Sequence, residues 1–411
     1  MTATAVDVTA RISGQPSMRS INRLHVMEAL RANGPLSRVE IGERTGLAPA
    51  TISEITAVLL AENLLRESRI VVAGRGRPRT LLEINADGGR VMGAKLSTHQ
   101  LTLSLTNFTG HAVDAVSVPL LPEKLGIMAT ADRVAVNIHT FLKKLRMMPA
   151  SLSGIGVGLP GFIESGTGTG QWSPLFGTDP PSFSKLMMER LGIPVVVEND
   201  VNLVALAERW FGEGRGVDSF CVVTVEHGVG MGMYLDGRLY RGRGGMAAEF
   251  GHVRHVEGGR LCRCGQFGCV EAYAADYAIV ARAAEILNLR TLDDAQMIND
   301  AVKEITRRAK LGDARMRGLF AEAGHALGLG IANVVNILTP ERVLVTGEAM
   351  RAEDLLMRPL IDTFQANILP FLRETTPLIW HAWGDEVWAQ GAAALVLSER
   401  FAGSSPDNQA R

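Results

Sequence analysis

The spacing of apolar residues changes along the chain. Between residues 18 and 61, apolar positions such as Ile21 and Leu24 recur at helical spacing. Later, short apolar runs typical of buried strands, such as residues 155–159 and 195–197, are separated by helical segments. Strands that alternate with helices are typical of an α/β fold. The pattern therefore predicts a small helical domain followed by a larger α/β domain.

Short signals mark the ends of the N-terminal helices. Residues 33–35 (Asn-Gly-Pro) end the first helix, and Ser37 with Glu40 forms a capping box that starts the second. Gly46 lies in the next turn, and Pro49 opens a third helix, where its missing N–H costs nothing. Two short helices joined by a glycine-containing turn are typical of a helix-turn-helix. The candidate DNA contacts at the start of the third helix are Pro49, Thr51 and Ser53.

A basic loop between two predicted strands follows these helices. The strands cover residues 65–72 and 80–84. The loop between them carries three arginines at alternate positions, Arg75, Arg77 and Arg79. Such a loop suits contacts to phosphates and to a minor groove. A helical interaction domain that does not touch DNA, or a solvated charge cluster, are the alternatives, but the order of the elements favours a DNA-binding winged helix-turn-helix over residues 18–84.

Net charge separates the first ninety residues from the rest. The whole chain carries −1 at pH 7, which excludes a uniformly basic nucleic-acid coat. Residues 1–90 contain twelve arginines, no lysine and nine acids, so they carry +3 and the remainder carries −4. No apolar run approaches the ~20 residues of a membrane span, and no signal-peptide segment begins the chain. We therefore expect a cytoplasmic protein without a membrane partner, with disordered tails at residues 1–17 and 403–411.

Three of the four cysteines lie within eight residues of one another. Cys262, Cys264 and Cys269 follow His252, which lies ten positions before the first of them. Three thiolates and one imidazole suit a closed tetrahedral zinc site, and four protein ligands leave no open position for catalysis. Loop thiols with a chance histidine nearby are the alternative, but the ligand spacing favours a structural zinc. In a reducing compartment, clustered thiols also favour metal over disulfides.

The same segment carries a resemblance to a known family. From Glu249 to Glu271 it reads E-x-G-H and then C-x-C-G-x-x-G-C-x-E, which resembles the signature of the ROK family of repressors, open reading frames and sugar kinases. The resemblance implies a winged helix-turn-helix followed by a two-lobed domain of the actin/hexokinase-like ATPase fold. The lobes would cover residues 88–200 and 201–402, with the zinc loop at 252–269.

The resemblance also implies a set of sugar contacts. The residues that match the family's sugar-binding positions are Gly161, Asn199, Asp200, Glu249, His252 and Glu271. Carboxylates suit this work because each accepts strong bonds from two hydroxyls. In the family's kinases, the aspartate that matches Asp200 is the general base. The residues alone leave another reading open, since Asp200 could instead be the N-cap of the helix that follows it.

The phosphate-binding loops of the family's kinases are altered in this chain. Residues 91–105 predict the first strand of a β-hairpin, where the kinases carry Asp-x-Gly-Gly-Thr-Lys. The matching residues 95–100 read Lys-Leu-Ser-Thr-His-Gln, so the aspartate and both glycines are absent. Side chains in place of glycine keep phosphate oxygens away from the backbone. The second loop has His227 in place of threonine. These differences predict a protein that is not an enzyme, with Asp200 as a vestigial base.

Together these features predict a transcriptional repressor of sugar-metabolism genes. Its partners would be double-stranded operator DNA and a monosaccharide or sugar-phosphate effector, and it would act as a homodimer or homotetramer. One alternative is an ATP-dependent sugar kinase with an added DNA-binding module. Another is a DNA-binding partner of a transport or signalling protein that takes no small ligand.

Overall fold

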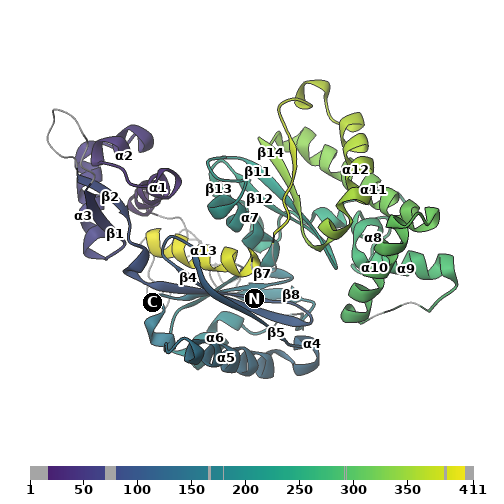
Figure 1. Ribbon diagram of the computed structural model, residues 1–411, viewed down its shortest axis with the longest axis horizontal. Helices are drawn as coiled ribbons and strands as arrows, with labels where there is room; N and C mark the ends of the chain where they lie inside the picture. Colours follow the sequence, from purple (N-terminus) through teal and green to yellow (C-terminus); the bar gives the residue numbers. More distant parts are fainter. Residues whose placement is uncertain are drawn as a thin grey trace, which may run out of the picture. The chain divides into compact units, whose positions relative to one another are not determined.

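The computed structural model describes most of the chain (Figure 1). The described residues are 17–69, 80–164, 168–178, 180–290, 292, 294–383 and 387–402. They form two compact units. The first takes in the described residues up to Arg90, residues 107–111 and those from Val396 onward, and the second comprises residues 91–106 and 112–395. The predicted domain limits at 84, 200 and 402 stay predictions. Both predicted tails lie outside the described residues, except that Ser17 caps the first helix.

Three helices and a hairpin form the N-terminal part of the first unit. The helices are α1 (Met18–Asn33), α2 (Arg38–Thr45) and α3 (Pro49–Ala61). The capping box is confirmed, because the Ser37 hydroxyl accepts from the Glu40 N–H while the Glu40 carboxylate accepts from the Ser37 N–H. Gly46 ends α2 in the left-handed conformation, and Pro49 occupies the first turn of α3. Local capping signals therefore predicted all three helices.

The two strands of the predicted wing form an antiparallel pair. Strands β1 (Leu65–Arg69) and β2 (Thr80–Ile84) pair along their whole length. Leu36, at the start of α2, joins this hairpin through two backbone hydrogen bonds with Leu82. The basic loop with Arg75, Arg77 and Arg79 lies outside the described residues. The helices and the two strands together give the winged helix-turn-helix arrangement.

The first unit also contains two segments from elsewhere in the chain. Phe108, in the turn after strand β4 (Gln100–Asn107), and Phe401, in the last turn of helix α13 (Val387–Ala402), are both buried. Their rings meet edge to face with centroids 6.5 Å apart. The N-terminal unit is therefore completed by the C-terminal helix, which the hydrophobic pattern of residues 18–84 did not indicate.

One five-stranded sheet forms the first layer of the second unit, in the order β10-β6-β3-β4-β5. Its strands are β3 (Arg90–Leu96), β4 (Gln100–Asn107), β5 (Ala112–Pro119), β6 (Ile155–Leu159) and β10 (Val195–Asn199). The prediction of one strand over residues 91–105 was wrong. A turn at residues 97–99 divides it, because the Ser97 hydroxyl accepts from the Gln100 N–H and the two residues also pair through their backbones.

Helices cover both faces of this sheet. Figure 1 shows α5 (Ile127–Lys144) and α6 (Phe183–Leu191) along one face and α13 along the other. Helix α13 packs on the sheet through backbone contacts, because a side chain at Gly93 or Gly156 would meet a carbonyl oxygen of α13 at 1.6 or 2.0 Å. These two glycines let the C-terminal helix lie directly against β3 and β6.

A second five-stranded sheet has the order β13-β12-β11-β14-β15. Its strands are β11 (Phe220–Val225), β12 (Val229–Leu235), β13 (Arg238–Leu239), β14 (Arg342–Thr346) and β15 (Leu378–Trp380). The helices packed with it are α7 (Asp200–Phe211), α8 (Glu271–Ala274), α9 (Asp276–Leu287), α10 (Ala295–Lys310), α11 (Ala314–Leu338) and α12 (Glu353–Asn367). A small sheet of β7 (Phe162–Glu164), β8 (Thr169–Ser173) and β9 (Gly177–Thr178) lies beside the first. The α/β prediction is confirmed.

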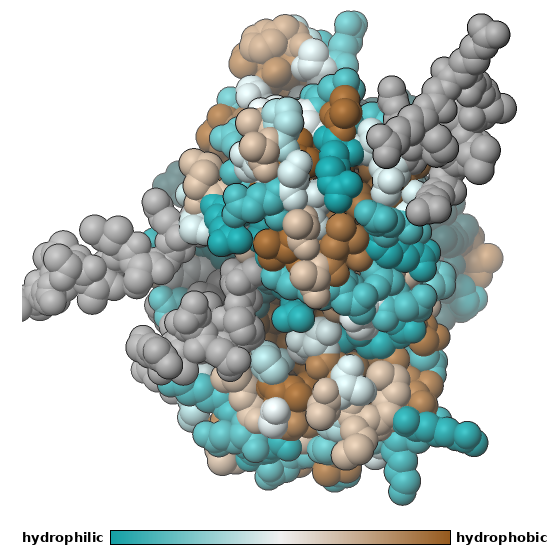
Figure 2. Space-filling view, turned by 90° about the vertical axis from the view of Figure 1, so that its left-hand side faces the viewer, coloured by the Kyte–Doolittle hydropathy of each residue, from teal (hydrophilic) through white to brown (hydrophobic). Residues whose placement is uncertain are grey.

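Among the described helices, α11 is the one that is long and apolar enough to cross a membrane. Its apolar window has a mean hydropathy of 1.2, but 61% of that window is buried inside the protein. Gly324 and Gly328 bring it against α12, where an added side chain would meet carbonyl oxygens at 2.7 and 2.4 Å. The composition of α11 is therefore that of a core helix. On the face drawn in Figure 2, hydrophobic residues lie in groups interrupted by hydrophilic ones.

Candidate functional site

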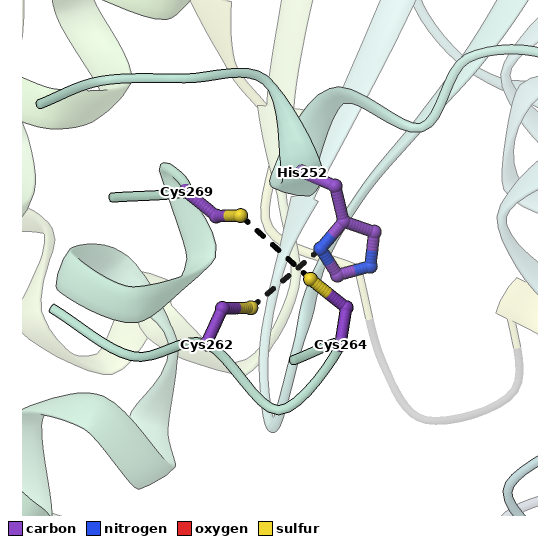
Figure 3. Close-up of side chains that lie close together, drawn as sticks. All are labelled: His252, Cys262, Cys264 and Cys269. Carbon is purple, nitrogen blue, oxygen red and sulfur yellow. Dashed lines mark hydrogen bonds between the residues drawn. The ribbon is translucent and has the colours of Figure 1, made fainter. Parts of the chain in front are cut away.

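The four predicted metal ligands come together in one loop region (Figure 3). The donor atoms of His252, Cys262, Cys264 and Cys269 all lie within 4.8 Å of one another. The Cys262 sulfur is 3.7 Å from the His252 Nδ1, and the sulfurs of Cys264 and Cys269 are also 3.7 Å apart. Tetrahedral zinc with Zn–S bonds of about 2.3 Å places sulfur atoms about 3.8 Å apart. The donor set therefore fits a closed zinc site.

The backbone of the loop depends on Gly268. This residue has a φ of 79°, and a Cβ there would lie 1.6 Å from the Val256 carbonyl oxygen. The Gly268 carbonyl accepts from the N–H groups of His255 and Val256, which ties the two halves of the loop together. No other residue type fits this position without moving the backbone. Cys269 is thereby held beside the other three ligands.

Burial changes the protonation of the thiols. It raises the pKa of Cys262 to about 12 and also raises the pKa of Cys269. The polypeptide alone therefore keeps these thiols protonated at neutral pH. A divalent cation reverses this preference, because it stabilises the thiolate. The raised pKa values make Cys262 and Cys269 poor nucleophiles, whereas the set of three sulfurs and one imidazole nitrogen is one that zinc accepts.

A large cavity adjoins the metal cluster, with a volume of about 1120 Å³. Residues from both five-stranded sheets line it. The predicted sugar contacts on its wall are Gly161, Asn199, Asp200, Glu249, His252 and Glu271. His252 belongs both to the group of possible metal ligands and to the cavity wall. The structure thus brings all six predicted residues to one place, while their contacts to a sugar stay predictions.

Asn199 organises the junction between β10 and α7. Its side-chain oxygen accepts from the N–H groups of Val201 and Asn202, so Asn199 is the N-cap of α7. The alternative that Asp200 is the N-cap is therefore wrong, because Asp200 is already the first helical residue. The Asn199 amide nitrogen donates to the Gly161 carbonyl at 3.1 Å. The side-chain oxygen and nitrogen of Asn199 therefore both form hydrogen bonds within the protein, and the nitrogen positions the Gly161 turn.

Asp200 faces the cavity from the first turn of α7. Burial raises the pKa of its carboxyl group, and the charge of Lys95 partly opposes this shift. One carboxylate oxygen accepts from the Val201 N–H at 3.0 Å. The carboxylate keeps further lone pairs for a hydroxyl donor in the cavity.

The two glutamates of the signature have different environments. Glu271 is buried, and its Oε2 accepts from the Val229 N–H at 3.1 Å while Oε1 accepts from the Tyr277 hydroxyl at 3.4 Å. It therefore holds the turn before β12 in place. Glu249 has 44% of its side chain exposed and lies 4.0 Å from the His252 Nε2. Partial burial raises the pKa of Glu249. Of the two, Glu249 is the more available to a ligand.

Lys95, at the end of β3, makes two contacts on the cavity wall. Its ammonium lies 3.6 Å from the Glu226 Oε2 and 3.5 Å from the ring centroid of Trp388. Burial raises the pKa of Glu226 to about 7, although Lys95 opposes the shift. The sequence analysis missed Trp388, which opens α13. The signal available was a large aromatic directly before a run of small residues.

A partly buried ion pair supports the junction that carries Asn199 and Asp200. The Glu198 side chain is completely buried, and its Oε2 accepts from the Arg241 Nε at 2.6 Å. Its Oε1 accepts from the Asn199 N–H at 2.9 Å. Glu198 was also missed by the sequence analysis, although it directly precedes the Asn-Asp pair. Its role is to hold the end of β10 rigid.

The candidate DNA contacts lie at the start of α3. Pro49 and Ser53 are exposed and Thr51 is half-buried. The Ser53 hydroxyl donates to the Pro49 carbonyl at 2.9 Å, so it is held within the helix in the absence of DNA. On the opposite face, Thr56 is fully buried and accepts from the Arg38 Nε at 3.0 Å. The exposed start of α3 suits entry into a groove.

Comparison with known families agrees with both parts of this architecture. A model described as the ROK family matches residues 105–399, which is most of the chain. The chain belongs to the ROK family. A second model, described as winged helix-turn-helix DNA-binding, matches residues 19–66. Both predictions from the sequence are thereby confirmed.

Two relatives align with nearly the whole of this chain. One is a xylose repressor of Caldicellulosiruptor bescii, 29% identical over 394 residues, which cover 93% of this chain and 96% of the relative. Another is the DNA-binding transcriptional dual regulator NagC of Escherichia coli K12, 27% identical over 390 residues, which cover 94% and 95%. Both alignments include the N-terminal region and the ROK domain together.

Among solved structures, a regulator of the family matches nearly the whole chain, and a kinase of the family matches three quarters of it. A ROK family transcriptional regulator, a homologue of the Escherichia coli MLC protein, has a TM-score of 0.79 and 27% identity and covers 94% of this chain and 97% of its own. A ROK family glucokinase from Streptomyces griseus, in complex with glucose and AMPPNP, has a TM-score of 0.62 and 26% identity and covers 75% and 99%. The two-lobed kinase-like fold of the ROK domain is therefore established.

Proposed function

We propose that this ROK protein is a DNA-binding transcriptional repressor of sugar-metabolism genes. The observation that carries the proposal is the presence, in one chain, of a winged helix-turn-helix and a ROK domain with a cavity lined by hydroxyl-binding groups. Relatives named as xylose and N-acetylglucosamine repressors align over 93% and 94% of the chain. A monosaccharide or sugar phosphate in the cavity would control operator binding.

The ligand groups of the cavity suit binding better than phosphoryl transfer. Asp200 and Glu249 can accept hydroxyl hydrogen bonds, which supports a sugar ligand. Lys95, however, pairs with Glu226 at the end of β3, where the kinases have a metal-binding aspartate. A cation at this position repels the magnesium that must accompany ATP. We therefore propose that the domain has lost ATP binding and is not an enzyme.

A sugar kinase with an added DNA module is the second candidate. Asp200, which matches the kinase base, is retained and its pKa is raised by burial, as a general base requires. The glucokinase of known structure also covers 75% of this chain. A coupled assay with ATP and a panel of hexoses distinguishes the two. Turnover of roughly 1–100 s⁻¹, as in ordinary kinases, would favour the kinase.

Regulation requires a conformational change between two states that alters both the cavity and the DNA-binding domain. We propose that a sugar closes the two lobes of the ROK domain, shifts the spacing of two DNA modules in a homodimer or homotetramer, and weakens operator binding. Such a shift needs only about 1–3 kcal/mol of coupling. A zinc ion at the Cys3His cluster would be structural, and the protein would act in the cytoplasm on double-stranded DNA.

DNA binding with and without sugars tests the proposal. Genomic fragments selected by the purified protein would be titrated by fluorescence anisotropy in the presence of single sugars. We expect saturable binding that one sugar of the panel weakens. The Asp200→Asn variant should bind the same fragment but respond to the sugar much less. A protein that selects no DNA fragment, or whose DNA affinity no sugar changes, would contradict the proposal.

A further inference from the structure

The cavity presents an aromatic surface beside its polar groups. Trp172 is 41% exposed and lines the cavity together with Phe162. The two residues are paired across strands β8 and β7, with ring centroids 5.8 Å apart and an interplanar angle of 47°. An exposed indole on a cavity wall leaves apolar area in water, which a ligand with a matching apolar face would cover.

The backbone holds this aromatic surface next to the hydroxyl-binding groups. A Cβ at Gly161 would lie 2.3 Å from the Trp172 carbonyl oxygen, so the Gly161 turn and β8 are in direct contact. The Ser173 hydroxyl donates to the Pro160 carbonyl at 2.9 Å and locks the same contact. On its other side, the Gly161 carbonyl accepts from Asn199. Trp172 is therefore fixed close to the start of α7, which carries Asp200.

The basic side chains of the cavity already have partners. Lys95 lies 3.6 Å from Glu226, Arg351 lies 3.1 Å from Glu348, and Lys303 lies 3.5 Å from Asp300. The Arg263 guanidinium stacks on Tyr277 at 3.8 Å from the ring centroid. These are the four lysines and arginines among the described residues that line the cavity. A phosphate would have to compete with existing contacts at Lys95, Arg263 and Arg351, and less so at Lys303, whose pair with Asp300 is largely exposed.

We propose that Trp172, supported by Phe162, stacks on the apolar face of an uncharged pyranose whose ring hydroxyls are all equatorial. Such a ring carries C–H groups on its faces and hydroxyls at its rim. The faces suit an indole, and the rim suits Asp200 and Glu249. An axial hydroxyl places a polar group on one face and reduces the fit. This inference rests on the proposed function and makes it narrower, since it favours a neutral sugar of the gluco or xylo type over a sugar phosphate.

Calorimetry with the full-length chain tests the inference. The probes are D-glucose, D-xylose and N-acetyl-D-glucosamine, with D-mannose as the epimer that has an axial hydroxyl and glucose 6-phosphate as the charged sugar. The Trp172→Ala variant should weaken binding of the preferred neutral sugar about tenfold or more, and Trp172→Phe should weaken it less. A matched control is Phe371→Ala, because Phe371 is 68% exposed and lies outside the cavity lining. That control should bind as the wild type does.

The outcomes separate this inference from the proposed function. Wild-type affinity in Trp172→Ala overturns the inference but leaves a sugar-responsive repressor intact. Tighter binding of glucose 6-phosphate than of every neutral sugar overturns it as well, as does equal binding of glucose and mannose. A wild-type protein that binds none of the five sugars overturns it together with the proposed effector. Unchanged circular dichroism of the variants excludes misfolding as the cause of a loss.

Discussion

Replacing Arg23 by alanine should destabilise the N-terminal unit more than any surface substitution. Arg23 lies in α1 and is only 5% exposed. Its Nε donates to the Phe401 carbonyl at 3.0 Å, and its two terminal nitrogens donate to the two Glu62 oxygens at 2.9 and 2.6 Å. Glu62 is the C-cap of α3, and Phe401 is in the last turn of α13. One guanidinium therefore joins three helices.

The size of the effect follows from these contacts. Breaking a buried ion pair costs about 3–5 kcal/mol, and a hydrogen bond to a charged group contributes about 1.5–3 kcal/mol. The Glu62 side chain is 38% exposed, so water can replace part of the hydrogen bonding that its carboxylate loses in Arg23→Ala. We therefore expect Arg23→Ala to lower the free energy of unfolding by about 2–3 kcal/mol. Arg23→Lys keeps the charge but loses the two-pronged geometry, so it should recover only part of this loss.

The effect should also depend on pH in a defined direction. The hydrogen bond from Arg23 holds the pKa of Glu62 below its usual value of 4.5. A carboxyl group with a lowered pKa in the folded state stabilises the protein above the unfolded pKa, and this contribution is lost as the pH falls through the folded pKa. The difference between the wild type and Arg23→Ala should therefore be full at pH 7 and shrink below pH 4.5.

Hydrogen exchange is the appropriate assay, because all five tryptophans lie beyond residue 170 and do not report on α1. Peptides from α1 and α3 should lose protection in Arg23→Ala at pH 7, with Glu62→Gln as the matched partner variant. A double-mutant cycle then isolates the coupling between the two side chains. Equal protection in the wild type and Arg23→Ala, or a difference that does not change at acid pH, would refute the reasoning.

Three further substitutions test the metal cluster, the Gly161 turn and the buried acid of the cavity. Cys264→Ser should reduce zinc measured by atomic absorption well below one ion per chain and lower the melting temperature, whereas Cys221→Ser, buried outside the cluster, should keep its zinc. Gly161→Ala should cost about 1–3 kcal/mol in thermal unfolding, because φ is 111° and the added Cβ would lie 2.3 Å from a backbone oxygen. The pKa of Glu226 is raised to about 7, so its contribution to stability is present below pH 4.5 and is lost as the pH rises to about 7. The stability difference between the wild type and Glu226→Gln should fall over that range, and a constant difference from pH 4 to pH 8 would contradict this assignment.

Features that depend on neighbours in sequence were predictable from the chain alone. The capping box at Ser37 and Glu40 and the proline at the start of α3 fixed the helix limits, because these signals act within one turn. The grouping of the four residues that could hold a metal ion was also predictable, because three of them share one short loop with a spacing typical of zinc ligands. The N-cap role of Asn199 was missed, because both Asn and Asp can cap a helix and only the observed hydrogen bonds distinguish them.

Features that depend on distant segments were not predictable. Arg23 and Phe401 are 378 residues apart in sequence, and no pattern near either one indicates the other. The contact between Lys95 and Trp388 likewise requires that α13 pack on β3, which follows from the fold and not from local spacing. Of these four residues, the sequence analysis considered only Lys95, as part of an altered phosphate loop. Their partners became visible only once the chain was folded.

These two distant contacts lie at opposite ends of the same helix. Helix α13 has Trp388 in its first turn, against Lys95 on the cavity wall, and Phe401 in its last turn, bonded to Arg23 in α1. We propose that a change at one end of this continuous helix affects the other end. A ligand that changes how Lys95 pairs with Glu226 would therefore bear on the helix that completes the DNA-binding unit.

Trp388→Ala tests whether this helix carries the signal. The substitution removes a cation–π contact of about 0.5–2 kcal/mol, which is comparable to the coupling that regulation needs. The variant should still bind the DNA fragment and the sugar. We expect the DNA dissociation constant with sugar, divided by the constant without sugar, to fall toward one. Leu311→Ala is a suitable control, since Leu311 is 75% exposed and lies outside the cavity lining. A full sugar response in Trp388→Ala would contradict a signal that passes through the contact between Lys95 and Trp388.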